Sequence, residues 1–79
     1  MAKQPDIETI RERFAAAVTA SARSVADIES AAGMKRDGLR DFLAHRKHRL
    51  SLSDAAALAV ELGTSLEWLA GMSRAKVEI

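Results

Sequence analysis

The chain has 79 residues and a formal net charge of +1, which is enough for one small domain and too little for a multidomain enzyme. It contains no cysteine, and this excludes a disulfide-stapled scaffold, a thiolate metal site and thiol catalysis. Apolar residues make up 48%, but 16 of them are alanine, so the core must be thin and closely packed. No apolar run approaches the ~20 residues of a membrane span, and no signal-peptide pattern opens the chain. We expect a small, soluble, mostly helical cytoplasmic domain.

The first predicted helix spans residues 7–20. Asp6 is a good N-cap for it. Apolar side chains then recur at helical spacing on one face: Ile7, Ile10, Phe14 and Val18. The charged side chains of the same helix are expected to face water: Glu8, Arg11, Glu12 and Arg13.

Two short helices follow, joined by a tight turn. Ser24 can cap the first of them, and Gly33 ends it, because a left-handed residue is commonly needed at that place. Its apolar positions are Val25, Ile28 and Ala32, and Met34 follows as an apolar plug. The next helix directs Leu39, Phe42 and Leu43 inward. Its outward positions are polar: Lys35, Arg36, Asp37, Arg40 and Asp41.

Two further helices complete the predicted fold. Ser51 and Asp54 form an S-x-x-D variant of the capping box before a helix that Gly63 closes. Thr64 and Glu67 form a second capping box, which begins a short helix that stops at Gly71. The fold class is therefore all-α, a compact bundle of five short helices. In the tail that follows, Val77 and Ile79 alternate as in a short strand.

Positive charge is concentrated in residues 34–49. This segment, MKRDGLRDFLAHRKHR, holds six Lys or Arg and two Asp, whereas the rest of the chain holds six basic and nine acidic residues. A basic block inside a mildly acidic chain is what a polyanion-binding surface requires. A solvated charged face is the ordinary explanation of a charge run, but this run overlaps a helix pattern.

The connection Gly33-Met34-Lys35 has the length and the glycine of the turn in a helix-turn-helix. Residues 24–71, SVADIESAAGMKRDGLRDFLAHRKHRLSLSDAAALAVELGTSLEWLAG, resemble the lambda-repressor-like, Cro/C1-type helix-turn-helix regulators. The ending ALAVELGTSLEWLAG is similar to the family's fourth and fifth helices, where an A-x-x-LG-x-S-x-x-WL-x-G pattern recurs. The segment GLRDFLAHRKHRL resembles a subgroup of phage-type repressors that carry a self-cleaving peptidase domain after this one.

The resemblance divides the chain into two parts. It implies that residues 1–71 would form a helix-turn-helix DNA-binding domain, and that residues 72–79 would form a C-terminal tail, either a linker or a dimer contact. Because no peptidase domain follows, we expect either the DNA-binding domain of a repressor or a compact stand-alone regulator.

One position departs from the family's pattern. The residue four before the turn glycine is usually small, because the two helices touch there, whereas this chain has Glu29. A carboxylate pressed into that contact would be costly if buried. We expect Glu29 to tilt outward, with a slightly wider helix crossing; the alternative is a register shifted by one residue. Met34, Leu39 and Phe42 support the unshifted register.

The resemblance also implies which side chains contact bases. Lys35, Arg36, Asp37 and Arg40 fall at or near the exposed N-terminal half of the recognition helix. Arg36 and Arg40 would each contact guanine through a bidentate pair of hydrogen bonds to O6 and N7. Asp37 would either accept a hydrogen bond from a cytosine amino group or merely favour the helix N-terminus. Gly38 indicates a close approach of the backbone to DNA or to the preceding helix.

The polar connection after this helix is expected to run along the sugar-phosphate backbone, with phosphate contacts from His45, Arg46, Lys47, His48 and Arg49. Arg23 and Ser24, at the start of the preceding helix, are further candidates for a phosphate contact. The spacing His45-x-x-His48 does not favour a metal, because its neighbours are cationic and no carboxylate or thiolate lies between them. No nucleophile–base pair and no glycine-rich phosphate loop is found, so neither catalysis nor a cofactor is expected.

We therefore expect a sequence-specific regulator of double-stranded DNA, a repressor of phage or mobile-element type. It would bind as a homodimer to a palindromic operator with half-sites ~10–10.5 base pairs apart. The candidate dimer surface is Leu66, Trp68, Leu69, Met72, Val77 and Ile79, with Trp68 favoured because Leu66 and Leu69 mostly belong to the core. No membrane contact or small-molecule ligand is expected.

The alternative function is an interaction module, in which the same fold serves as an antitoxin or an adaptor and docks an acidic protein on its basic face. It draws on Glu29 and on the acidic remainder of the chain. A structural nucleoid protein would need a larger positive charge than +1.

Overall fold

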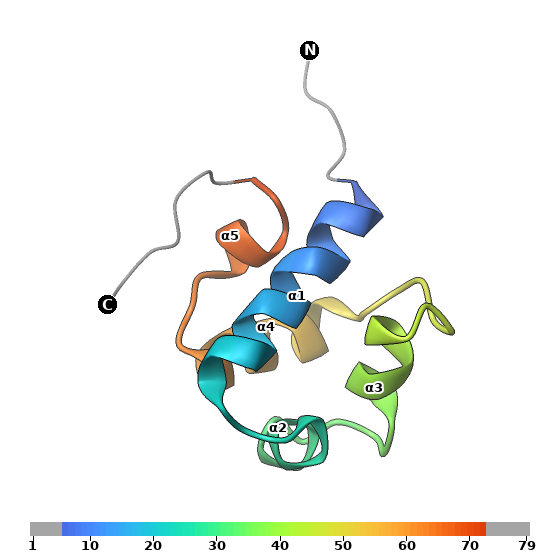
Figure 1. Cartoon of the computed structure of the whole chain (residues 1–79), viewed down its shortest axis with the longest axis vertical. Coiled ribbons are helices and arrows are strands. Elements are labelled where there is room, and N and C mark those ends of the chain that lie inside the picture. Colours follow the sequence, from blue (N-terminus) through green and yellow to red (C-terminus); the bar gives the residue numbers. More distant parts are fainter. Residues whose placement is uncertain (1–5, 73–79) are drawn as a thin grey trace.

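A computed structural model describes residues 6–72, a range that contains five helices and no strand (Figure 1). The helices are α1 (Ile7–Ser21), α2 (Val25–Ala31), α3 (Gly38–Leu43), α4 (Leu52–Leu62) and α5 (Leu66–Leu69). The prediction of an all-α chain with five short helices is therefore confirmed for the described residues. Val77 and Ile79 of the predicted tail lie outside them.

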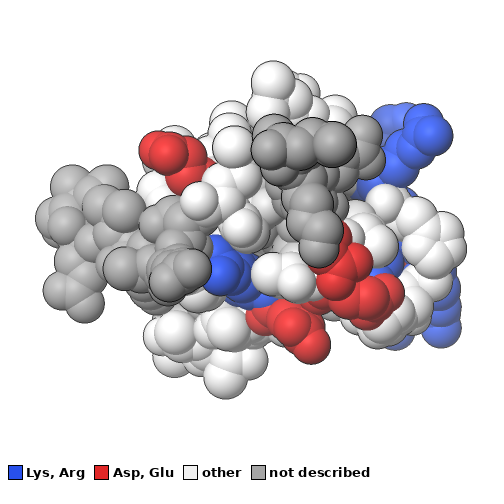
Figure 2. Space-filling view, turned by 90° about the horizontal axis from the view of Figure 1, so that it is seen from above, with Lys and Arg blue, Asp and Glu red and all other residues white. Residues whose placement is uncertain are grey.

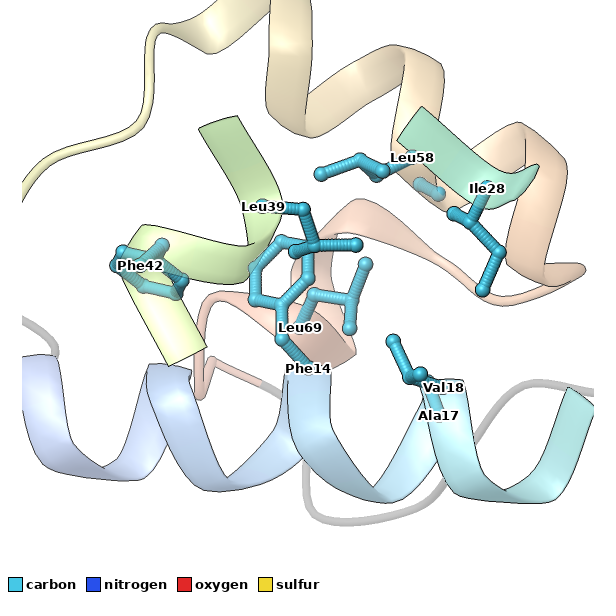
Figure 3. Close-up of a cluster of buried hydrophobic side chains, with 9 residues drawn as sticks. Phe14, Ala17, Val18, Ile28, Leu39, Phe42, Leu58 and Leu69 are labelled. Atoms are coloured by element: carbon cyan, nitrogen blue, oxygen red, sulfur yellow. The ribbon is translucent and has the colours of Figure 1, made fainter. Parts of the chain in front are cut away.

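The helices surround one apolar core to which all five contribute (Figures 1 and 3). In Figure 1, α1 runs diagonally across the molecule with α4 behind it. α5 lies to the left of α1, α2 lies below it and α3 lies to its right. The buried apolar side chains are Phe14, Ala17, Val18, Ile28, Leu39, Phe42, Leu58, Ala59 and Leu69. The rings of Phe14 and Phe42 meet edge to face with their centroids 5.7 Å apart, so the inner side of α3 is packed directly on α1.

Local signals set several helix ends as predicted. The hydroxyl oxygens of Ser24 and Ser51 each accept a hydrogen bond, at 3.1 Å, from the backbone N–H three residues later. Gly33 is left-handed, with φ +74°, and the N–H of Met34 donates to the carbonyl of Glu29 at 3.0 Å. This is the Schellman closure that the glycine predicts. Met34 packs against the core as the expected plug.

The cap of α5 is displaced by one residue from the prediction. The hydroxyl of Ser65 accepts the capping hydrogen bond from the N–H of Trp68 at 3.1 Å, so the predicted capping box of Thr64 and Glu67 is wrong. The reason is that Thr64 belongs to the end of α4: it is buried, and its N–H donates to the carbonyl of Ala59 at 3.1 Å.

Candidate nucleic-acid interface

The residues expected to contact bases lie partly before α3 and partly on it. Lys35 and Arg36 are exposed on the linker of residues 32–37, Asp37 is the N-cap residue, and Arg40 is exposed on α3 itself. The prediction that the helix already includes residues 35–37 is wrong. The reason is that Asp37 has φ +66°, a left-handed conformation that a right-handed helix cannot contain.

Glu29 supplies the cap at the start of α3. Its carboxylate accepts hydrogen bonds from the N–H of Asp37 at 3.2 Å and from the N–H of Arg40 at 2.8 Å, and the residue is only 5% exposed. The side chain of Asp37 makes no capping hydrogen bond. The predicted outward tilt of Glu29 is therefore wrong. Burial is tolerated because two backbone donors and the positive end of the helix dipole replace the hydration of the carboxylate.

Arg11 holds the other end of α3, and the prediction that it faces water is wrong. It is 3% exposed, and its Nε donates to the carbonyl of Phe42 at 2.8 Å, while Nη2 donates to the carbonyl of Lys47 at 3.4 Å. Nη1 is paired with Glu8 at 2.7 Å, and the guanidinium lies 5.1 Å from the centroid of the Phe42 ring. A cation at this end adds a second donor to the carbonyl of Phe42, which also accepts the N–H of His45 at 3.3 Å, and it complements the negative end of the helix dipole.

Helical periodicity carries a signal for both buried charges. Arg11 falls four residues after Ile7 and three before Phe14, and Glu29 falls four residues after Val25, so both positions belong to apolar faces. The charge of each side chain is what makes exposure the ordinary expectation. Arg13 departs from its prediction more mildly: it is half-buried, donates to the carbonyl of Trp68 at 2.7 Å and stacks on its ring.

The basic connection leaves α3 through His45, whose φ is +66° at a place where glycine is usual. The N–H groups of Arg46 and Lys47 then donate to the carbonyl of Asp41 at 2.9 and 3.2 Å. The Arg46 guanidinium also lies 3.8 Å from the carboxylate of Asp41. The start of the connection is thereby fixed to α3. The exposed members of this group are His45, Arg46, His48 and Arg49, while Lys47 is half-buried.

The structure brings the linker, α3 and the following connection together. The guanidinium of Arg40 lies 3.9 Å from the carboxylate of Asp37. A Cβ at Gly38 would stand 3.0 Å from the Met34 methyl and 3.9 Å from the Lys47 ammonium, so the backbone of Gly38 closely approaches the side chain that follows α2. In Figure 2, Lys and Arg gather toward the right-hand end, the side where Figure 1 places α3 and the chain after it.

Arg23 and Ser24 make their contacts elsewhere. Arg23 bonds Asp27 at 2.9 Å and the carboxylate of Glu61 at 3.3 Å, which ties the start of α2 to α4. These partners raise the pKa of the Arg23 guanidinium above its ordinary value, the hydrogen bond to Asp27 contributing most and that to Glu61 next. Ser24 is exposed and its hydroxyl caps α2. The phosphate contacts of both residues stay predictions.

The predicted dimer surface is only partly open. Leu69 is fully buried, while Leu66 and Trp68 are half-buried against the core and the Arg13 guanidinium covers the indole ring. Met72 is 71% exposed and, with Leu66, lines an apolar groove of about 560 Å³ that is bounded by α1, by the connection after α3, by the start of α4 and by α5.

No protein-family model, no curated protein and no solved structure matches this chain. Within residues 6–72, no helix combines the length and the apolar character needed to cross a membrane. The described residues also hold no group of three or more metal-ligating side chains.

Proposed function

We propose that this protein is a sequence-specific, double-stranded DNA-binding transcriptional regulator, a repressor of phage or mobile-element type. In this proposal α2 and α3 form a helix-turn-helix, and α3 enters the major groove. The observation that carries the proposal is the way α3 is held: a short helix with an exposed arginine is fixed at both ends by buried charges of opposite sign. Reading base edges demands that a side chain be placed within about 0.5 Å, and such fixed helix ends provide this precision.

The exposed cations then divide into two roles. Arg36 and Arg40 contact guanine, since a guanidinium matches O6 and N7 in the major groove. The side chains of residues 45–49 contact phosphates, which sets the register and makes affinity fall with salt by roughly 0.9 logarithmic units for each phosphate neutralised. One domain makes few such contacts, so we propose a homodimer on a palindromic operator.

This function is tested by selecting bound sequences from a random duplex library. The selection is done at about 0.15 M salt, because the affinity for DNA depends on the salt concentration. The expected result is an enriched palindrome. An enriched half-site alone would indicate a monomeric DNA-binding domain. No enrichment would contradict the proposal.

Variants of the exposed arginines sharpen the test. Arg36→Ala and Arg40→Ala are each expected to relax the preference at one base pair and to cost about 1–3 kcal/mol of binding free energy on the selected site. Arg46→Ala is the matched comparison, because a lost phosphate contact weakens binding to all sequences alike and reduces the salt slope by about 1. Unchanged affinity and preference in both Arg36→Ala and Arg40→Ala would contradict the proposed recognition.

The alternative function, an antitoxin or adaptor that docks an acidic protein, rests on less. It draws on Glu29 as a departure from the family's pattern, and the capping contacts of Glu29 account for that departure. An adaptor would retain DNA weakly and without sequence preference, which the same selection detects.

A further inference from the structure

Glu29 contacts three successive parts of the connection between α2 and α3. Its carbonyl accepts the N–H of Met34 at 3.0 Å, and its two carboxylate oxygens accept the N–H groups of Asp37 and Arg40 at 3.2 and 2.8 Å. One residue of α2 thus holds the turn, the N-cap and the first turn of α3. Arg36 lies within the segment that Glu29 contacts, and the backbone N–H of Arg40 is hydrogen-bonded directly to the Glu29 carboxylate.

The carboxylate of Glu29 takes the capping role that the side chain of Asp37 does not fill. α3 has six residues, too few to be a stable helix by itself, and its N-cap residue Asp37 is left-handed and makes no capping hydrogen bond. Without this carboxylate the N–H groups of Asp37 and Arg40 would lose their acceptors, whereas the N–H of Gly38 donates to the carbonyl of Lys35 at 3.0 Å. The orientation of the first turn of α3 relative to α2 therefore depends on the two oxygens of Glu29.

We propose that Glu29 is a positioning residue for DNA recognition: its carboxylate sets the pose of α3 and of the linker, so that sequence preference depends on a side chain that does not itself face DNA. This inference rests on the proposed function. It predicts that specific affinity and non-specific affinity separate when the carboxylate is altered, because phosphate contacts tolerate a tilted helix whereas bidentate base contacts do not.

Glu29→Gln is the sharpest probe, because glutamine keeps the shape but offers one acceptor oxygen in place of two. Its amide NH₂ then faces a backbone N–H, and one hydrogen bond is lost. The substitution also raises the net charge by one unit, which by itself favours binding to DNA. A loss of affinity would therefore run against the change in charge, and the sign of the effect distinguishes positioning from bulk electrostatics.

The experiment compares the wild-type chain with Glu29→Gln and with Glu67→Gln, which makes the same charge change at an exposed position on α5. Binding is measured to the duplex selected by the wild-type chain and to a scrambled duplex, and backbone amide NMR spectra report on residues 37 and 40. For Glu29→Gln we expect about tenfold weaker binding to the selected duplex, the loss expected for one charge-assisted hydrogen bond, and scrambled-duplex affinity within about twofold. The amide shifts of Asp37 and Arg40 should move, and Glu67→Gln should lose no specific affinity.

A folded Glu29→Gln that binds the selected duplex as tightly as the wild-type chain would overturn the inference. Where Glu29→Gln does not fold, Glu29→Asp decides, since it keeps the charge and both oxygens but shortens their reach; it should lose specific affinity in the same way. Loss of the fold in both variants would also contradict the inference, because Glu29 would then hold the domain together rather than set the pose of α3. A wild-type chain that selects no sequence overturns the proposed function instead, and the amide shifts still report whether Glu29 positions α3.

Discussion

α3 and α4 are two helices of one small domain, and their ends are fixed by different means. α4 spans 11 residues, and both of its ends are set by adjacent residues: the hydroxyl of Ser51 caps its start, and the left-handed Gly63 closes its end. α3 spans six residues between two left-handed positions that carry side chains, Asp37 and His45. His45 closes the C-terminal end of α3 as Gly63 closes that of α4, because the N–H groups of His45 and Arg46 donate to the carbonyls of Phe42 and Asp41 at 3.3 and 2.9 Å. Asp37, in contrast, makes no side-chain capping hydrogen bond at the start of α3.

The cap at the start of α3 comes instead from another helix, through Glu29 of α2, and Arg11 of α1 adds a side-chain donor to the carbonyl of Phe42 near its end. We call α1, α2 and α4 the frame of the domain. The position of the short helix α3 depends on the contacts that α1 and α2 make with it. We therefore expect substitutions near α4 to alter stability locally, whereas substitutions in α1 or α2 alter how α3 is presented.

The largest expected effect comes from removing the distant cap at the end of α3. Arg11→Met keeps the length of the side chain but removes the guanidinium donor from the carbonyls of Phe42 and Lys47, and it removes the stacking on the Phe42 ring. The carbonyl of Phe42 then keeps only the 3.3 Å hydrogen bond from the N–H of His45. We expect the free energy of unfolding to fall by about 2–3 kcal/mol, measured by urea denaturation. Arg36→Met, an equal change at an exposed position on the linker, should leave stability within about 0.5 kcal/mol. Equal free energies of unfolding for Arg11→Met and Arg36→Met would contradict the claim that a side chain of another helix stabilises α3.

A smaller loss is expected at the local cap of α4. Ser51→Ala deletes the hydroxyl that accepts from the N–H of Asp54 and should lower the free energy of unfolding by about 1 kcal/mol. Ser30→Ala, at an exposed position on α2, is the control and should change stability little. Because α4 belongs to the frame, Ser51→Ala should leave the preferred DNA sequence unchanged; a shifted preference in the selection would count against this separation.

The smallest effect is a gain. His45 occupies a left-handed position, and glycine there removes the steric conflict at the expense of greater freedom in the unfolded chain. His45→Gly should raise the free energy of unfolding by about 0.5 kcal/mol while weakening DNA binding through a lost phosphate contact. Ala44→Gly, one residue earlier at φ −86°, has no such strain to relieve and should be neutral or destabilising. A destabilised His45→Gly would show that His45 is held by contacts rather than strained.

The same contrast explains how much of the fold could be predicted from the sequence. The limits of α4 follow from Ser51 and Gly63, and the inward register of α3 follows from Leu39 and Phe42, since these signals lie within or beside each helix. The start of α3 could not be predicted in this way, because its cap lies eight residues before Asp37, in another helix.

The candidate site was predictable to a similar degree. The cluster of exposed cations on the linker, α3 and the following connection is evident from composition, and the structure places most of these side chains at the surface. The two buried charges that hold α3 were missed, because burial of Arg11 and Glu29 is tolerable only with backbone groups brought together by the tertiary fold.

The most direct test of the central claim, that α3 and its flanking segments form the DNA-contacting surface, is a map of backbone amide shifts on titration with the selected duplex. We expect the largest shift changes within residues 35–49 and the smallest in residues 52–62 of α4. Largest changes in α4 or α5, with residues 35–49 unaffected, would contradict that claim.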